Sequence, residues 1–158
     1  MAEKTYSPVP KPGVAEGIEE SSVVEPLTRR GYKRLPATER QISEASIQDA
    51  ATLVMRARQR DENAPEYLSA EALIYFIRRA DRNDNRKTRD SLFRELFERC
   101  IPFFRGKFRG FSVEVREDLQ GDVLNKVAED MFTPDDSGDF MQVRFWTYCP
   151  ASAPMRQI

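Results

Sequence analysis

The stretch that decides the fold is SLFRELFERCIPFFRGKF, residues 91–108. Its apolar residues recur at intervals of three and four, the spacing that places side chains on one face of an α-helix. They are Leu92, Phe93, Leu96, Phe97, Cys100, Phe103, Phe104 and Phe108. The pattern predicts a helix from about residue 88 to 109, kinked at Pro102. Other elements must bury so wide an apolar face, and we expect an all-α fold.

Two further helices are expected before this one. Apolar residues at helical spacing between residues 47 and 57 predict a helix over about 44–61, with Ser46 and Asp49 resembling a capping box. Ser69 is a good N-cap for the next helix, and Leu68 can pack onto Leu73. The buried side of that helix is expected to hold Leu73, Ile74, Phe76, Ile77 and Ala80.

Two helices are expected after residue 109. The first begins after Ser112 or Val113 and ends near Phe132, because apolar residues repeat in steps of four from Leu119 to Met131. TPDDSGD, residues 133–139, has the composition of a loop, and a last helix is expected from about Phe140 to Cys149. The chain is therefore predicted to form a small bundle of four to five helices.

Both ends of the chain differ from this helical part. Residues 1–42 hold five of the ten prolines and no apolar period, which predicts a disordered tail. The alternative is a docking arm around RRGYKR, residues 29–34, where four cations flank Tyr32. Residues 43–149 form the predicted helical domain, and residues 150–158 an irregular tail, because Pro150 and Pro154 oppose a continuing helix.

Composition excludes several classes of function. The chain has 158 residues and no histidine, so neither histidine catalysis nor zinc binding by histidine is open to it. No glycine-rich phosphate loop, nucleophile motif or metal-ligand set is present, and Cys100 is interpreted as a core residue. We expect no enzyme, cofactor, metal or small-molecule substrate. The longest apolar run, residues 72–77, is too short to span a membrane, and we expect a cytoplasmic protein.

Charge is divided along the helical part although the whole chain sums to -1. Residues 78–109 carry eleven Lys or Arg and five Asp or Glu, whereas residues 114–139 carry two and nine. Within the acidic part, Asp118, Asp122, Asn125 and Glu129 follow a helical spacing. This row is open to three readings: a solvated face, a metal-carboxylate site, or a surface for a basic partner. The metal site is the weakest, since such sites draw inward carboxylates from several helices.

Three segments carry a resemblance to a known family. SLFRELFERCIPFFRGKFRG, VREDLQGDVLNKVAEDMF and FMQVRFWTYC together resemble region 2 of bacterial RNA polymerase sigma factors, over about residues 66–149. In that family, the pattern Asp/Glu-Asp-Leu-x-Gln-Glu-x-Phe binds the coiled coil of the polymerase clamp. Residues 117–119 fit this pattern and Asp122 takes the glutamate place, but Gly121 replaces the glutamine. The resemblance implies core RNA polymerase as a partner, with contacts by Asp118, Gln120, Asp122, Asn125 and Lys126.

The closing aromatic stretch resembles the helix with which that family reads the promoter -10 element. Exposed rings can stack on unpaired bases, and cations can contact phosphate. The implied DNA-binding residues are Arg105, Lys107, Arg109, Arg144, Trp146 and Tyr148. Because Pro150 and Pro154 follow at once, we expect a truncated or frame-shifted relative whose binding to single-stranded promoter DNA is weakened or lost. The alternative is that Phe145, Trp146 and Tyr148 are core residues.

Two functions follow from these observations as expectations. The first is a sigma-factor-like transcription initiation module that binds core RNA polymerase. The alternative is a non-enzymatic helical protein-protein interaction domain unrelated to polymerase, whose acidic row is an ordinary solvent-exposed face.

Overall fold

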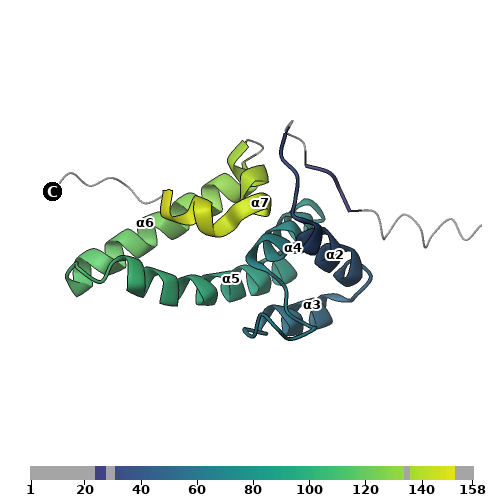
Figure 1. The fold of residues 1–158 in the computed structure, drawn as a ribbon, viewed down its shortest axis with the longest axis horizontal. Coiled ribbons are helices and arrows are strands. Elements are labelled where there is room, and N and C mark those ends of the chain that lie inside the picture. The colour runs from purple at the N-terminus through teal and green to yellow at the C-terminus, as the bar shows by residue number, and fades with distance from the viewer. Residues whose placement is uncertain (1–23, 28–30, 134–135, 152–158) are drawn as a thin grey trace, which may run out of the picture.

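The computed structural model describes residues 24–27, 31–133 and 136–151 (Figure 1). These residues form helices and connecting segments, without a strand, so the predicted all-α class is confirmed. Six helices occur within them: α2 (Pro36–Ala45), α3 (Ala50–Ala57), α4 (Ala70–Arg82), α5 (Arg86–Lys107), α6 (Val113–Phe132) and α7 (Asp136–Ala151). None of the helices in the described ranges is both long enough and apolar enough to cross a membrane.

Helix α4 is the centre of the bundle. It packs against α2, α5, α6 and α7, and its segment from Ala72 to Ile77 is buried throughout. The long helices α5 and α6 extend from this centre, joined at the far end by residues 108–112, and α7 lies along α6 (Figure 1). The molecule therefore has a compact end around α2, α3 and α4, and an arm built from α5, α6 and α7.

Local capping explains where the three longest uninterrupted helices begin. The hydroxyl of Ser69 accepts a hydrogen bond from the Ala72 N–H at 3.2 Å, and Ser112 caps α6 in the same way through Val115 at 3.4 Å. Both N-caps were expected from the sequence. Helix α5 is capped by the side chain of Asn85, which accepts a hydrogen bond from the Thr88 N–H, and the helix continues through Pro102.

The N-terminal part differs from the prediction. The expected helix over 44–61 is wrong, because two shorter helices, α2 and α3, occupy residues 36–57. Ser46 ends α2 by bonding the Ile42 carbonyl, and Asp49 caps α3, so the two residues do not form a capping box. The tail predicted over residues 1–42 is also too long, since α2 begins at Pro36 and Ile42 is fully buried. Residues 1–23 and 28–30 of that tail lie outside the described residues.

Helix α7 begins at Asp136, earlier than the predicted Phe140, and it is interrupted. Arg144 has non-helical backbone angles, φ -149° and ψ 74°, so two helical pieces meet there. The break releases the Phe145 N–H from the helical ladder, and the carboxylate of Glu71 on α4 accepts it at 3.1 Å. A side chain from another helix therefore satisfies the backbone at the break. The predicted irregular tail begins within α7 and otherwise lies outside the described residues.

The core agrees with the expected apolar faces in most positions. Leu96, Phe104, Leu119 and Val123 are buried together, as the periodicity predicts. Trp146, for which a place in the core was the alternative interpretation, is 37% exposed and packs against the rings of Phe103 and Phe145. Phe93, Phe97 and Phe103 of the expected face of α5 are only partly buried, and the rings of Phe93 and Phe97 pack against each other.

Candidate protein-interaction surface

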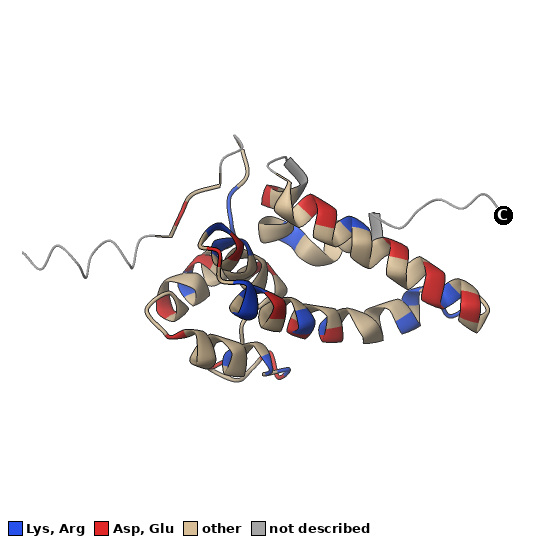
Figure 2. Cartoon of the chain, turned by 180° about the vertical axis from the view of Figure 1, so that it is seen from behind, with Lys and Arg blue, Asp and Glu red and all other residues tan. Residues whose placement is uncertain are grey.

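Helix α6 has two unlike faces. Leu119, Val123, Val127 and Met131 are buried and anchor it to the bundle. The opposite side is exposed and carries Glu114, Glu117, Asp118, Asp122, Asn125 and Glu129, which we name the acidic face of α6. Figure 2 shows acidic residues recurring along this helix, and basic residues on α5 and near the connector between α5 and α6. The acidic row expected from the sequence is therefore a continuous surface on a firmly packed helix.

Three of the five expected polymerase contacts belong to this acidic face. Asp118, Asp122 and Asn125 follow one another at helical spacing and are all exposed. Gly121 lies among them, and a Cβ atom added there would meet no atom within 4 Å. The position that departs from the family pattern is thus at the middle of the acidic face and is open to solvent.

Lys126 lies at the edge of the acidic face and binds within the protein. Its Nζ is 2.7 Å from the Oδ1 of Asp130, one turn along α6. Asp130 is buried, and its other carboxylate oxygen accepts a hydrogen bond from the hydroxyl of Tyr148 on α7. Lys126 therefore helps to neutralise a buried carboxylate that joins α6 to α7.

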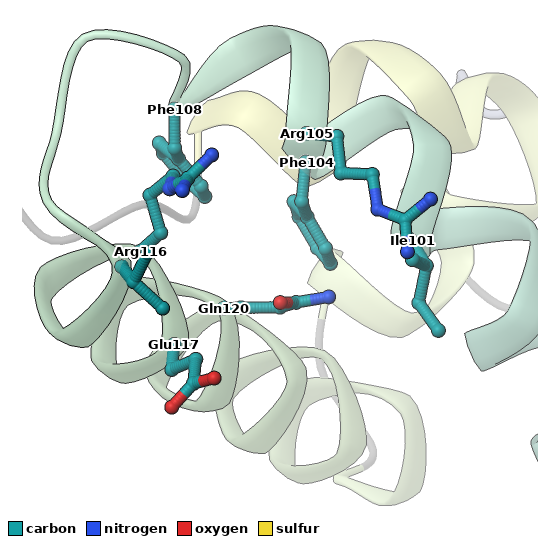
Figure 3. A pocket seen from close by; sticks show the side chains of 8 residues that line it. Ile101, Phe104, Arg105, Phe108, Arg116, Glu117 and Gln120 are labelled. Atoms are coloured by element: carbon teal, nitrogen blue, oxygen red, sulfur yellow. The ribbon is translucent and has the colours of Figure 1, made fainter.

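Gln120 points away from the acidic face. It lines a cleft of ≈ 310 Å³ between α5 and α6, near the end of the arm (Figure 3). Phe104 and Phe108 form the apolar wall of this cleft, while Arg105 and Arg116 lie at its rim. The cleft was not expected from the sequence, since it depends on how the two helices diverge.

The expected DNA-binding residues divide into exposed and buried ones. Arg105, Lys107 and Arg109 are exposed around the C-terminal end of α5, and Arg144 is exposed at the break in α7. Tyr148, in contrast, is 7% exposed and donates its hydroxyl to Asp130. We expected the Tyr148 ring to stack on bases, but the ring packs in the core and is not exposed for such contacts.

The arginines of α4 already have partners within the fold. Arg78 pairs with the buried Asp139 at 3.1 Å, and Arg82 pairs with Glu25 at 2.5 Å. The guanidinium of Arg79 lies 4.8 Å from the centre of the Phe76 ring. Arg78 and Arg82 therefore tie α7 and the N-terminal segment to α4, whereas Arg79 packs within α4.

Sequence reasoning missed the role of two carboxylates. From the sequence, Glu71 is a first-turn residue expected to interact favourably with the positive end of the helix dipole, and Asp130 is one of the negative charges of residues 114–139. Both accept hydrogen bonds from α7, and burial raises the pKa of Glu71 above its ordinary value. A buried glutamate or aspartate within an apolar helical face is the signal that could have indicated such roles, because a buried charge needs a partner.

The described ranges contain no group of three or more His, Cys, Asp or Glu side chains arranged to hold a metal ion. What the acidic face offers is charge and hydrogen-bond acceptors for another macromolecule. Comparison of the chain with protein-family models, with curated proteins and with solved structures finds no match in any of the three.

Proposed function

We propose that this chain is a sigma-factor-like transcription initiation module that binds core RNA polymerase through the acidic face of α6. The observation that carries the proposal is the exposed row of Asp118, Asp122 and Asn125 on a helix whose other side is buried. A helix held in this way presents its charges in one arrangement, so little ordering entropy is lost on binding. The clamp coiled coil is the partner that the resemblance to region 2 implies.

Electrostatics support a basic partner for this surface. Carboxylates at the acidic face favour encounter with a positively charged helix, and such steering weakens as salt screens the charges. Asp118, Asp122 and Asn125 are the contacts that we assign. We do not assign the other two expected contacts, since Lys126 pairs with Asp130 and Gln120 lines the cleft away from the acidic face.

The test is binding of purified core RNA polymerase to the full chain and to charge-reversed variants. Replacing Asp118 and Asp122 together by lysine should reduce binding at least about tenfold, since two attractive contacts become repulsive. A matched control replaces Glu62 and Glu66 by lysine. These residues are exposed on the connector between α3 and α4, and the charge change is the same.

An equal loss of binding in both double variants would show that net charge, and not the acidic face, governs the interaction. Circular dichroism of each variant at the same temperature checks that the helices are retained. Unchanged binding by the Asp118 and Asp122 variant would refute the surface.

Weak DNA binding is the second part of the proposal. Of Phe145, Trp146 and Tyr148, Trp146 alone is exposed, so one ring is available for stacking where several would be needed for base recognition. Arg105, Lys107, Arg109 and Arg144 can contact phosphates, which gives affinity without sequence preference. Binding of single strands should therefore be weak, salt-sensitive and indifferent to base sequence.

Fluorescence anisotropy with promoter-like and scrambled single strands at two salt concentrations tests this second part. A preference for the promoter-like strand that persists at high salt would contradict it.

The alternative function is a helical interaction domain unrelated to polymerase, and one observation favours it. Ile47 and Met55 are 72% and 69% exposed beside α3, and a groove of ≈ 490 Å³ runs between α3 and the start of α5. Met55 lines this groove together with Ala50, Ala51 and Val54, and a contiguous apolar surface is typical of protein-binding sites. If the wild-type chain fails to bind purified core polymerase even at low salt, this alternative replaces the first proposal.

A further inference from the structure

The cleft between α5 and α6 has the dimensions of a small-ligand site. Its volume of ≈ 310 Å³ lies at the lower end of the roughly 300 to 1,000 Å³ that is usual for pockets that bind small organic molecules. Its walls belong to two helices whose buried residues, Phe104 on α5 and Leu119 on α6, share the common core. The cleft is therefore held in shape by the packing of the bundle.

The inner surface of the cleft is apolar. The rings of Phe104 and Phe108 stack with an interplanar angle of 11° and their centres 5.7 Å apart, so together they form one flat wall. Ile101 on α5 is half-buried and Val113 on α6 is 57% exposed, and both add apolar surface at the opening. A ring or a branched hydrocarbon placed here removes apolar surface from water, which favours its binding.

The rim of the cleft is cationic. Arg105 projects from α5 and Arg116 from α6, and the amide of Gln120 lies below the Phe104 ring (Figure 3). Both guanidinium groups lack an ion-pair partner among the residues that the structure describes, whereas the arginines of α4 pair or stack within the fold. A guanidinium group is a planar donor whose geometry matches carboxylate and phosphate oxygens.

One carboxylate also lines the cleft. Glu117 belongs to the acidic face of α6, and in Figure 3 its side chain turns away from the phenylalanine rings. The lining thus carries two positive charges and one negative charge, and an anionic head group at the rim is attracted on balance. The two arginines belong to different helices, so this attraction exists only where α5 and α6 approach each other.

We propose that this cleft is a binding site for a small amphipathic anion, that is, an organic molecule with an apolar body and one carboxylate or phosphate head group. The body lies against Phe104 and Phe108, and the head group lies at the rim, near Arg105 and Arg116. The Gln120 amide can donate or accept a hydrogen bond and is available to a further polar group of the ligand. The site is distinct from the polymerase contacts that we assign, and it does not depend on them.

The experiment titrates the isotopically labelled full chain, without polymerase, and follows its amide chemical shifts. Phenylacetate and phenyl phosphate are the probes, and they distinguish the two head groups. Phenethyl alcohol has the same kind of body without a charge, and acetate has the charge without the body. We expect the shifts to concentrate in residues 101–108 and 113–120, including the Gln120 side-chain amide. At least one of the two probes should bind at least about fivefold more tightly than either control compound.

Three variants test the roles of the cations. Arg105→Gln and Arg116→Gln should each weaken binding of the preferred probe about five- to tenfold and leave binding of phenethyl alcohol unchanged, because only the charge contact is lost. Arg94→Gln is the matched control. Arg94 is exposed on α5 outside the cleft, so this variant loses the same charge and should keep full affinity.

Several results would overturn the site. They are a lack of binding by both probes, binding of the alcohol as tight as that of both probes, and shifts centred on the groove beside α3 instead of on the cleft. An equal loss of affinity in Arg94→Gln and in the two cleft variants would show attraction by net charge alone. If a cleft variant fails to fold by circular dichroism, the comparison of probes and control compounds on the wild-type chain decides the question.

Discussion

At the scale of single residues, Glu71 is the side chain whose ionisation bears most directly on stability. Its carboxylate accepts the Phe145 N–H at the break in α7, and burial raises its pKa above the ordinary value. A pKa raised in the folded state means that folding favours the protonated form. The stabilising contribution is present below the unfolded pKa, about 4.3, and is lost as the pH rises through the folded value. At neutral pH the ionised Glu71 therefore carries a desolvation cost.

We predict that Glu71→Gln removes this pH dependence. Glutamine keeps an oxygen for the Phe145 N–H but has no charge to desolvate. The free energy of unfolding of the variant should equal or exceed that of wild type at pH 7, and the difference should shrink toward pH 4. Urea denaturation across this pH range measures it.

The control for this prediction is Glu71→Ala, which removes the acceptor. It should lose about 1 to 3 kcal/mol at both pH values, because a buried N–H is left without a partner. A Gln variant less stable than wild type at pH 7 would show that the charge itself stabilises the break.

Two phenylalanines of α5 give a second prediction at this scale. Phe104 is 2% exposed, so Phe104→Ala should cost about 3 to 5 kcal/mol of unfolding free energy. Phe97 is only partly buried, and Phe97→Ala should cost clearly less, although their places in the sequence pattern are alike. Thermal or urea melts compare them. Equal losses would contradict the burial difference described here.

At the scale of elements, the two glycines of α6 and α7 are in opposite surroundings. Gly121 lies in the middle of α6, where an added Cβ meets nothing within 4 Å. Gly138 on α7 is enclosed, and an added Cβ would lie 3.0 Å from the Asp130 carbonyl oxygen. Replacement of these glycines by alanine should therefore change the free energy of unfolding in opposite directions at the two positions.

We predict that Gly121→Ala raises the free energy of unfolding by about 1 kcal/mol through helix propensity. Gly138→Ala is the matched control and should lower it, since backbone must shift to admit the methyl group. Urea melts test both. Gly121→Gln should stabilise like alanine and, if the polymerase proposal holds, should also strengthen polymerase binding where alanine does not. A gain by alanine equal to that by glutamine would assign the effect to helix stability alone.

The helices that sequence reasoning predicted well are those defined by local signals. Ser69 and Ser112 begin α4 and α6 by hydrogen bonds to residues three positions later, and such signals can be read from the sequence. The boundary between α2 and α3 was missed because Ser46 matches a capping residue but ends α2 instead. The break at Arg144 has no local signal, since its partner, Glu71, comes from another helix.

The candidate interaction surface could likewise be predicted only where local sequence signals determine it. The acidic face of α6 could be predicted because helical spacing alone places Asp118, Asp122 and Asn125 together. The inward role of Tyr148 could not, because it depends on the buried Asp130 of α6 lying within reach of its hydroxyl. Spacing along one helix does not show which helix packs against it.

At the scale of the whole molecule, one buried contact joins the two ends of the described chain. Arg34 donates from Nε and Nη2 to the Oε1 of Gln142 on α7, at 3.0 and 2.8 Å, and its guanidinium lies 5.1 Å from the Tyr75 ring centre. Both side chains are buried. The segment before α2 is thus bound to α7 across α4.

We predict that Arg34→Ala and Gln142→Ala each destabilise the fold by about 1 to 3 kcal/mol, because each leaves a buried polar partner unsatisfied. The double variant should cost less than the sum of the two, as expected for residues in one hydrogen-bonded pair. A double-mutant cycle from urea melts gives the coupling. Strict additivity would mean that the two residues stabilise the fold independently.

The contact between Arg34 and Gln142 also has a consequence for biosynthesis. The two residues are separated by 108 positions, so Arg34 leaves the ribosome long before its partner is made. At roughly 5 to 20 residues per second, the nascent chain waits on the order of 5 to 20 s for Gln142. During this interval the face of α4 that carries Glu71 and Arg78, the residues that pair with α7 in the finished fold, stays uncovered. Translation speed over the codons for α5 and α6 therefore sets how long this face of α4 stays uncovered.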